Sequence, residues 1–197
     1  MRMTLSAAAS RRESFPLLDD VIVLADIAMA SNHPQKIVPA LAEGLRGALA
    51  DVGALPAWLL ETSADGPVRR ELYRSPEFDY QVIAIAWAPG QGSGVHDHAD
   101  TWGVEAVLRG ELEVLDYRIA GRHKALTELR PADHRPLPAG SVIGLLPPHH
   151  LHACRNAGQR GVTVSLHIYG KPLRDVTRYV HEHEALYREE KARLTSV

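Results

Sequence analysis

Cysteine is nearly absent from this chain, since Cys154 is the one cysteine among 197 residues. A single thiol excludes an internal disulfide framework, which is typical of small secreted proteins, and it favours the cytoplasm. The N-terminal stretch carries Arg11 and Arg12 after a run of alanines and has no apolar segment of signal-peptide length. We therefore expect a cytoplasmic protein that is not exported.

Long apolar runs and blocks of one charge are also missing. The longest apolar stretch, residues 21–30, contains Asp26 and is far shorter than the roughly 20 residues that cross a bilayer. Lysine and arginine number 22 against 24 aspartate and glutamate residues, which gives a formal charge of −2 and no basic footprint. The sequence therefore predicts neither a membrane span nor a nucleic-acid partner.

Helical spacing marks the N-terminal part of the chain. Apolar residues recur four positions apart, for instance at Leu41, Leu45 and Leu49. Ser31-Asn32-His33-Pro34 interrupts this pattern and is typical of a break between two helices. We predict a helical part within residues 1–66.

Past residue 66 the pattern changes to short runs of strand-forming residues separated by glycine and proline. These runs cover residues 80–87, 102–108, 111–119, 141–146 and 161–169. Many short strands predict a mainly β barrel over residues 67–170. The charged segment that follows has near-helical spacing, which predicts a C-terminal helix within residues 171–197. A chain of this length with 45% hydrophobic residues closes one core, so we expect a single domain, residues 1–197.

One pair of histidines has the spacing of metal ligands. His96 and His98 are two residues apart, and on a strand such residues point to the same face, where both imidazoles can reach one ion. His181 and His183 repeat the spacing, but in the predicted C-terminal helix residues two apart diverge. We therefore place a metal site at His96 and His98 only.

A third ligand has to come from elsewhere, and residues 147–152 offer three histidines. We predict His152 as the third ligand. His150 shares its face on a regular strand and is a rival, whereas His149 should face away. All three chosen ligands would then be neutral imidazoles.

These residues resemble the two signature motifs of the cupin barrels. The first is Gly90-x5-His96-Asp97-His98 with later glycines at 103 and 110, and the second is His152-x3-Asn156. The resemblance implies a mainly β fold, a double-stranded β-helix barrel with N-terminal helices and, here, the predicted C-terminal helix. A typical cupin has a ligating glutamate where this chain has Gly103. Glu105 shares the face of that position and remains an alternative ligand.

Three facial ligands leave positions on an octahedral ion for substrate and oxygen, as in the non-haem Fe(II) oxygenases. Iron(II) is therefore the predicted metal, with zinc as its competitor. Because three histidines leave the ion's charge unbalanced, an anionic thiolate substrate would suit this site.

Within the cupins the sequence resembles the thiol dioxygenases, the family of cysteine dioxygenase and the bacterial mercaptopropionate and mercaptosuccinate dioxygenases. The resemblance covers residues 69–169 and is most specific at Ser165-x-His167-x-Tyr169. It implies a hydrogen-bonded chain on one strand face, in which Ser165 orients His167 and His167 holds the Tyr169 hydroxyl near the iron. There the hydroxyl would contact bound oxygen or substrate.

The resemblance also implies an arginine that binds the substrate carboxylate in a bidentate manner. Counting from Trp87 assigns this role to Arg70, with Arg69 as the alternative if the strand register differs by one. Arg178 is a second candidate, because some mercaptopropionate dioxygenases place an arginine at a similar distance past the tyrosine. The cysteine that crosslinks to the tyrosine in animal enzymes is replaced here by Gly103, so no such crosslink can form.

The implied reaction adds both atoms of O₂ to the sulfur of a small thiol carboxylate and yields a sulfinate. L-cysteine, oxidised to cysteine sulfinate, is the first expected substrate, and 3-mercaptopropionate and mercaptosuccinate are the alternatives. Two other classes compete with this interpretation. One is a zinc or manganese cupin isomerase or hydrolase that uses Glu105; the other is a non-catalytic, ligand-sensing cupin, which would have no use for Tyr169 and its partners.

Overall fold

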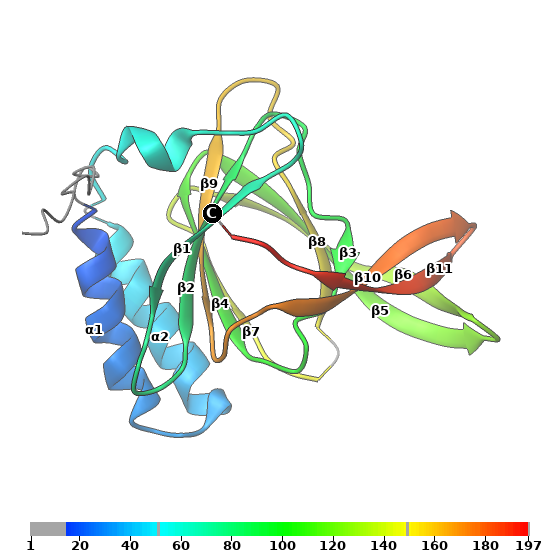
Figure 1. Ribbon diagram of the computed structural model, residues 1–197, viewed down its shortest axis with the longest axis horizontal. Coiled ribbons are helices and arrows are strands. Elements are labelled where there is room, and N and C mark those ends of the chain that lie inside the picture. Colours follow the sequence, from blue (N-terminus) through cyan, green and yellow to red (C-terminus); the bar gives the residue numbers. More distant parts are fainter. Residues whose placement is uncertain (1–14, 51, 149, 197) are drawn as a thin grey trace, which may run out of the picture.

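The computed structural model describes residues 15–50, 52–148 and 150–196. Helices α1 (Leu17–Met29) and α2 (Pro34–Leu49) and the short 3-10 helix η1 (Ala57–Leu60) lie on one side of a β barrel (Figure 1). The N-terminal residues that bear on export and His149 lie outside the described ranges. None of the described helices has both the length and the apolar character that a membrane crossing requires.

The two helices form where the apolar spacing predicts them. Helix α2 begins at Pro34, whose fixed φ and missing N–H suit the first helical position. It buries one face, which includes Leu41 and Leu45, against the outer side of the barrel. Strand β7 passes so close that a Cβ at Gly144 would collide with the Val38 side chain, which is why glycine is required there.

A five-stranded antiparallel sheet separates the helices from the barrel interior. Its strands, in spatial order, are β1 (Val68–Arg74), β2 (Gln81–Trp87), β9 (Thr163–Tyr169), β4 (Gly103–Arg109) and β7 (Val142–Leu145). Every residue of β2 and β9 is buried, so both faces of these strands are covered. On β9, Leu166 and Ile168 pack towards the helices, and Ser165, His167 and Tyr169 alternate with them and face the interior.

The remaining strands pair in a closed order and form the facing wall of the barrel. They are β3 (Val95–His96), β5 (Glu111–His123), β6 (Leu126–Pro138), β8 (Leu151–Arg155), β10 (Asp175–His183) and β11 (Leu186–Arg193). The hairpins β5–β6 and β10–β11 extend beyond the barrel, away from the helices (Figure 1). The predicted fold class, a mainly β barrel with N-terminal helices, is confirmed.

The predicted C-terminal helix is wrong. Residues 175–193 form the hairpin β10–β11, which turns at Glu184, a residue with a φ of 51°. Strand β10 places Val176 and Tyr179 in the core, and it pairs with β3 as well as with β11. β-branched and aromatic residues favour strands, and tertiary pairing here overrides a charge pattern that is equally compatible with a helix.

Packing of α2 on the sheet should supply a large share of the stability. We expect Leu45→Ala to lower the free energy of unfolding by about 2–5 kcal/mol, because it leaves a cavity at a fully buried position. Ile27→Ala, at a side chain that is 69% exposed, should change it by about 0.5 kcal/mol or less. Urea denaturation of both variants measures this; equal effects would contradict the assigned packing.

Candidate functional site

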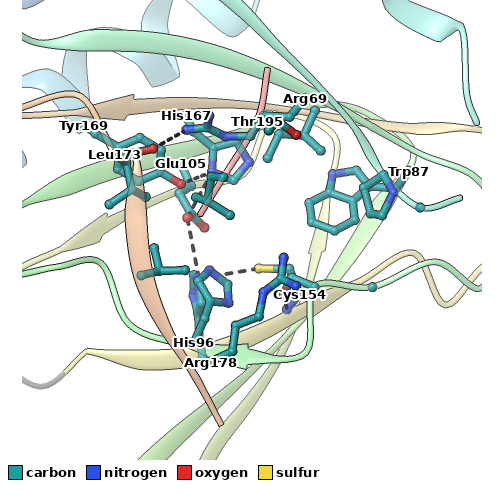
Figure 2. Close-up of a pocket in the computed structure, with 18 of the residues that line it drawn as sticks. Arg69, Trp87, His96, Glu105, Cys154, His167, Tyr169, Leu173, Arg178 and Thr195 are labelled. Atoms are coloured by element: carbon teal, nitrogen blue, oxygen red, sulfur yellow. Dashed lines mark hydrogen bonds and ion pairs between the residues drawn. The ribbon is translucent and has the colours of Figure 1, made fainter. Parts of the chain in front are cut away.

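A cavity of about 440 Å³ lies inside the barrel and is lined by strands of both walls. Figure 2 shows its residues: His96, Cys154 and Arg178 come from one wall, and Glu105, His167 and Tyr169 come from the other. Trp87 and Leu173 add apolar surface to the same cavity. The sequence-predicted histidines and the Ser-His-Tyr strand therefore meet at one place.

The three predicted metal ligands converge. His96 on β3 lies directly opposite His152 on β8, and His98 follows β3 by two residues. One nitrogen from each imidazole lies within 4.8 Å of the others. The rings are 4.7–5.2 Å apart between centroids and meet edge to face, so their nitrogens point at a shared position without stacking.

Orphaned nitrogens show that this cluster fits a metal ion. Both ring nitrogens of His98 and the Nδ1 of His152 are buried and have no hydrogen-bond partner among the described residues. Nδ1 of His96 lies 3.1 Å from the carbonyl oxygen of Gly94, which orients the ring and leaves Nε2 for a ligand. Buried polar atoms without partners are costly, and a shared cation would satisfy one nitrogen of each ring.

Two neighbours of the cluster belong to further groups that could hold a metal ion, and both groups share His152. Nε2 of His150 lies 3.4 Å from the Asp116 carboxylate, and these two residues group with His152. Cys154 groups with His152 and Glu105, and burial raises the pKa of its thiol well above its ordinary value. The group of His96, His98 and His152 is the one that contains the histidine pair predicted from the sequence.

The Ser165-His167-Tyr169 chain is present on β9 with hydrogen-bonding distances. Ser165 Oγ lies 2.7 Å from His167 Nε2, and Tyr169 Oη lies 3.1 Å from His167 Nδ1. Trp87 extends the chain, because its indole N–H donates to Ser165 Oγ at 2.8 Å. Trp87 lies in the sequence pattern but was not predicted as a member of this chain.

Trp87 fixes one donor role in the chain. An indole N–H only donates, so Ser165 Oγ accepts from Trp87. The contacts of His167 with Ser165 and Tyr169 are compatible with either tautomer of the imidazole, because each hydroxyl can donate or accept. With the proton on Nδ1, His167 donates to Tyr169 and the phenolic proton is free; with the proton on Nε2, Tyr169 donates to His167.

Tyr169 is positioned by a glycine on the neighbouring strand. Gly103 lies directly opposite Tyr169, and a Cβ there would be 3.1 Å from the tyrosine ring and 3.3 Å from Leu145. The ring occupies the space that a side chain at 103 would need. Burial and the nearby Glu105 charge raise the pKa of Tyr169 well above its ordinary value, so the phenol keeps its proton.

Glu105 is buried in the middle of the site. Its Oε1 lies 3.0 Å from Nδ1 of His167, 3.7 Å from Nε2 of His152 and 3.9 Å from Nε2 of His98. Burial alone would raise the pKa of this carboxyl, but His152 and His167 lower it well below its ordinary value. The sequence predicts Glu105 as an alternative ligand, because it lies two residues after Gly103 and therefore on the same face of the strand.

The arginine prediction needs a correction. Arg70 points to the helix side of β1, where its guanidinium contacts Glu61 at 3.1 Å and 3.3 Å, outside the cavity. Arg69 lines the cavity, because it pairs with Ile85, an inward-facing residue of β2, whereas Arg70 pairs with outward-facing Ala84. The register therefore selects the alternative, Arg69.

Arg178 also lines the cavity, and it does so from a strand that was predicted to be a helix. It lies directly opposite His96, which places a second cation beside the histidine cluster. The residues Leu194 and Thr195 close the same side of the cavity, and Arg69 donates to Ser196 Oγ at 2.6 Å. The sequence analysis did not predict Leu194, Thr195 or Ser196 as site residues. It placed them in a C-terminal helix, and a helix gave no reason to bring them to the cavity.

The fold and the site together define a barrel of the cupin class with a histidine cluster in its interior. The chain belongs to the cysteine dioxygenase type I family, whose model matches residues 69–182, more than half of the chain. This confirms the predicted family. The sequence is similar to cysteine dioxygenase type 1 of Danio rerio, with 26% identity over 94 residues. That match covers 48% of this chain and 46% of the relative, so it spans about half of the relative's length.

Two solved structures are also similar. The protein TT1209 from Thermus thermophilus has a TM-score of 0.44 and 19% identity, over 60% of this chain and 95% of that one. A conserved protein with a double-stranded β-helix domain from Klebsiella pneumoniae has a TM-score of 0.43 and 18% identity, over 60% and 88%. Both comparisons concern the fold alone.

Buried histidines should make the metal-free protein sensitive to acid. Burial and the neighbouring His96 lower the pKa of His98 to about 3, whereas an unfolded histidine titrates near 6.5. Between these values the unfolded chain binds the extra proton, so stability falls as pH drops below about 6.5. Each such group costs up to about 1.4 kcal/mol per pH unit.

We therefore expect the metal-free protein to lose thermal stability steadily from pH 7 to pH 5, and the His98→Asn variant to lose less over the same interval. The exposed His183 supplies the control, and His183→Asn should follow the wild type. Melting temperatures across this pH range measure the effect. Parallel curves for all three proteins would rule out this role of His98.

Proposed function

We propose that this protein is an Fe(II)-dependent thiol dioxygenase that converts a small thiol carboxylate into its sulfinate. The observation that carries the proposal is the meeting of the histidine cluster, the Tyr169 chain and two arginines in one cavity. Membership of the cysteine dioxygenase type I family supports it. The overall conversion, R–S⁻ + O₂ → R–SO₂⁻, balances without another reductant, because sulfur loses the four electrons that oxygen gains.

His96, His98 and His152 would hold the iron, as the sequence predicts. Iron(II), when bound, supplies a site where thiolate sulfur and oxygen come together and react. The protein keeps all three imidazoles neutral through burial, which lowers the pKa of each and leaves its lone pair available. A zinc or manganese isomerase that uses Glu105 is the competing class, and metal content with oxygen uptake separates the two.

Arg69 and Arg178 would bind the carboxylate end of the substrate. Both lie at the cavity wall, and an arginine holds a carboxylate through two parallel hydrogen bonds. Such a clamp fixes the far end of the molecule and turns its sulfur towards the histidines. Ile85, Leu173 and Val176 provide apolar walls that limit water beside the reacting sulfur.

L-cysteine is the first candidate substrate, because the matched family is named for it. Mercaptosuccinate is the second, and the presence of two arginines in the cavity favours it, since this thiol carries two carboxylates. 3-mercaptopropionate has one carboxylate and no amine, which makes it a useful comparison.

The oxygen electrode tests this proposal directly. Protein loaded anaerobically with Fe(II) should consume one O₂ for each thiol when offered L-cysteine, 3-mercaptopropionate and mercaptosuccinate in turn. We expect Arg69→Gln to raise KM at least tenfold for the accepted thiol, which corresponds to the loss of about 1.4 kcal/mol of binding. Arg178→Gln should raise KM more for mercaptosuccinate than for the monocarboxylates.

Arg70→Gln is the matched control, because Arg70 is the neighbouring residue and contacts Glu61 outside the cavity. Its KM should stay at the wild-type value in the fraction that is folded. Zinc bound in place of iron, together with no oxygen uptake from any thiol, would show that the protein is not a thiol dioxygenase.

Tyr169 would act as the proton-holding group of the site. Its phenol is protonated. When His167 carries its proton on Nδ1, the phenolic proton of Tyr169 is free to be donated to oxygen or to the developing sulfinate. We expect Tyr169→Phe to lower kcat about 10²-fold or more and to change KM little, as for other single donors. Tyr187→Phe, on the hairpin strand β11, should retain wild-type rates. Equal rates for the two variants would remove Tyr169 from the chemistry.

A further inference from the structure

We propose that Glu105 is a fourth ligand of the metal ion held by His96, His98 and His152. The proposal rests on the metal site of the proposed function and deepens it. A barrel that lacks the expected acid at position 103 would thereby regain a carboxylate from two residues further along the same strand.

The position of the carboxylate supports this assignment. Strand β4 directs Glu105 into the interior opposite His167, and Figure 2 shows its oxygens turned towards the histidines. Oε1 lies 3.7 Å from Nε2 of His152 and 3.9 Å from Nε2 of His98. Two ligands about 2.1 Å from one ion lie roughly 3 Å apart when adjacent and roughly 4.2 Å apart when opposite. Both measured distances fall within that range.

The carboxylate has few other partners. Both oxygens of Glu105 are buried, and neither has a hydrogen bond of good geometry among the described residues. Its nearest neighbour is Nδ1 of His167, which lies 3.0 Å from Oε1 and is shared with the Tyr169 hydroxyl at 3.1 Å. A buried carboxylate with so little compensation is costly, and a divalent ion between it and the imidazoles would stabilise it.

Two alternative roles for Glu105 fit these observations less well. A purely structural ion pair with His167 would satisfy one oxygen of Glu105 and would leave both ring nitrogens of His98 without a partner. A metal ion held by Glu105, His152 and Cys154 alone would likewise leave His98 without a partner. An ion held by the three histidines and Glu105 gives a partner to each of these rings and to the carboxylate.

The fourth ligand changes the charge of the site and its open positions. Three neutral histidines, one carboxylate and a dipositive ion sum to +1, so an incoming thiolate makes the buried cluster neutral. Six-coordinate geometry would leave two positions for exogenous molecules rather than three. A thiol would then attach through its sulfur alone, and its carboxylate would be bound by the arginines.

Metal binding without turnover tests this inference. Fe(II) affinity is measured anaerobically by competition with a chelator for the wild type, Glu105→Gln, Glu105→Asp and the control Glu111→Gln, whose side chain is exposed. The visible spectrum of the Co(II)-loaded proteins reports the ligand set. We expect Glu105→Gln to weaken binding at least tenfold and to change the Co(II) bands, with Glu111→Gln equal to the wild type.

Glu105→Asp separates ligation from simple attraction between charges. It keeps the negative charge but withdraws the carboxylate by one methylene, so it should weaken binding nearly as much as Glu105→Gln if the oxygen is a ligand. Wild-type affinity in Glu105→Asp, or unchanged Co(II) bands in Glu105→Gln, would overturn the fourth ligand and leave the three-histidine site intact. A wild-type protein that binds no Fe(II) or Co(II) would overturn the proposed function as well.

Discussion

The alternation of side chains across the central strands β2, β9 and β4 is the constraint on which the rest of this structure depends. These strands are covered on both sides, by helices on one face and by the facing wall on the other. Each must therefore carry apolar residues towards the helices and place its polar residues in the interior. A shift of one residue would move Ser165, His167 and Tyr169 out of the cavity and against the helices. Packing of the apolar residues against the helices thus keeps the Ser165-His167-Tyr169 chain facing the cavity.

The two walls of the barrel place ionisable side chains in and around its interior. Burial lowers the pKa of His96, His98 and His152, which keeps them neutral, and the buried Glu105 carboxylate lies within 3.9 Å of His98, His152 and His167. Cations stand at the cavity wall, where Arg69 lies on the first strand and Arg178 on the tenth. An anionic ligand entering this space meets positive charge on both sides. The arrangement favours anions of small size, since apolar residues occupy the remaining surface.

Much of the fold and of the candidate site could be predicted from local patterns. The helices follow from four-residue spacing, and His96 with His98 and the Ser165-His167-Tyr169 chain follow from period-two spacing on strands. The predictions of Arg70 and of a C-terminal helix failed because they depend on strand pairing with other parts of the chain. The choice between Arg69 and Arg70 depends on pairing with β2, where one residue of register reverses the face. The C-terminal segment is rich in charge and compatible with either helix or strand, and it forms strands through pairing with β3 and β6.

The pairing of β10 with β3 also bears on how the protein is made. His96 and its neighbour Arg178 are adjacent in space but far apart in the sequence, so this wall forms only after the C-terminal hairpin has left the ribosome. Until then the strand that carries His96 has an unpaired edge, and polar interior residues are open to solvent. The nascent chain would gain a complete ligand pocket only once β10 has been synthesised, when its helices and central sheet can already have packed. Assembly of the pocket is therefore coupled to the closure of the barrel.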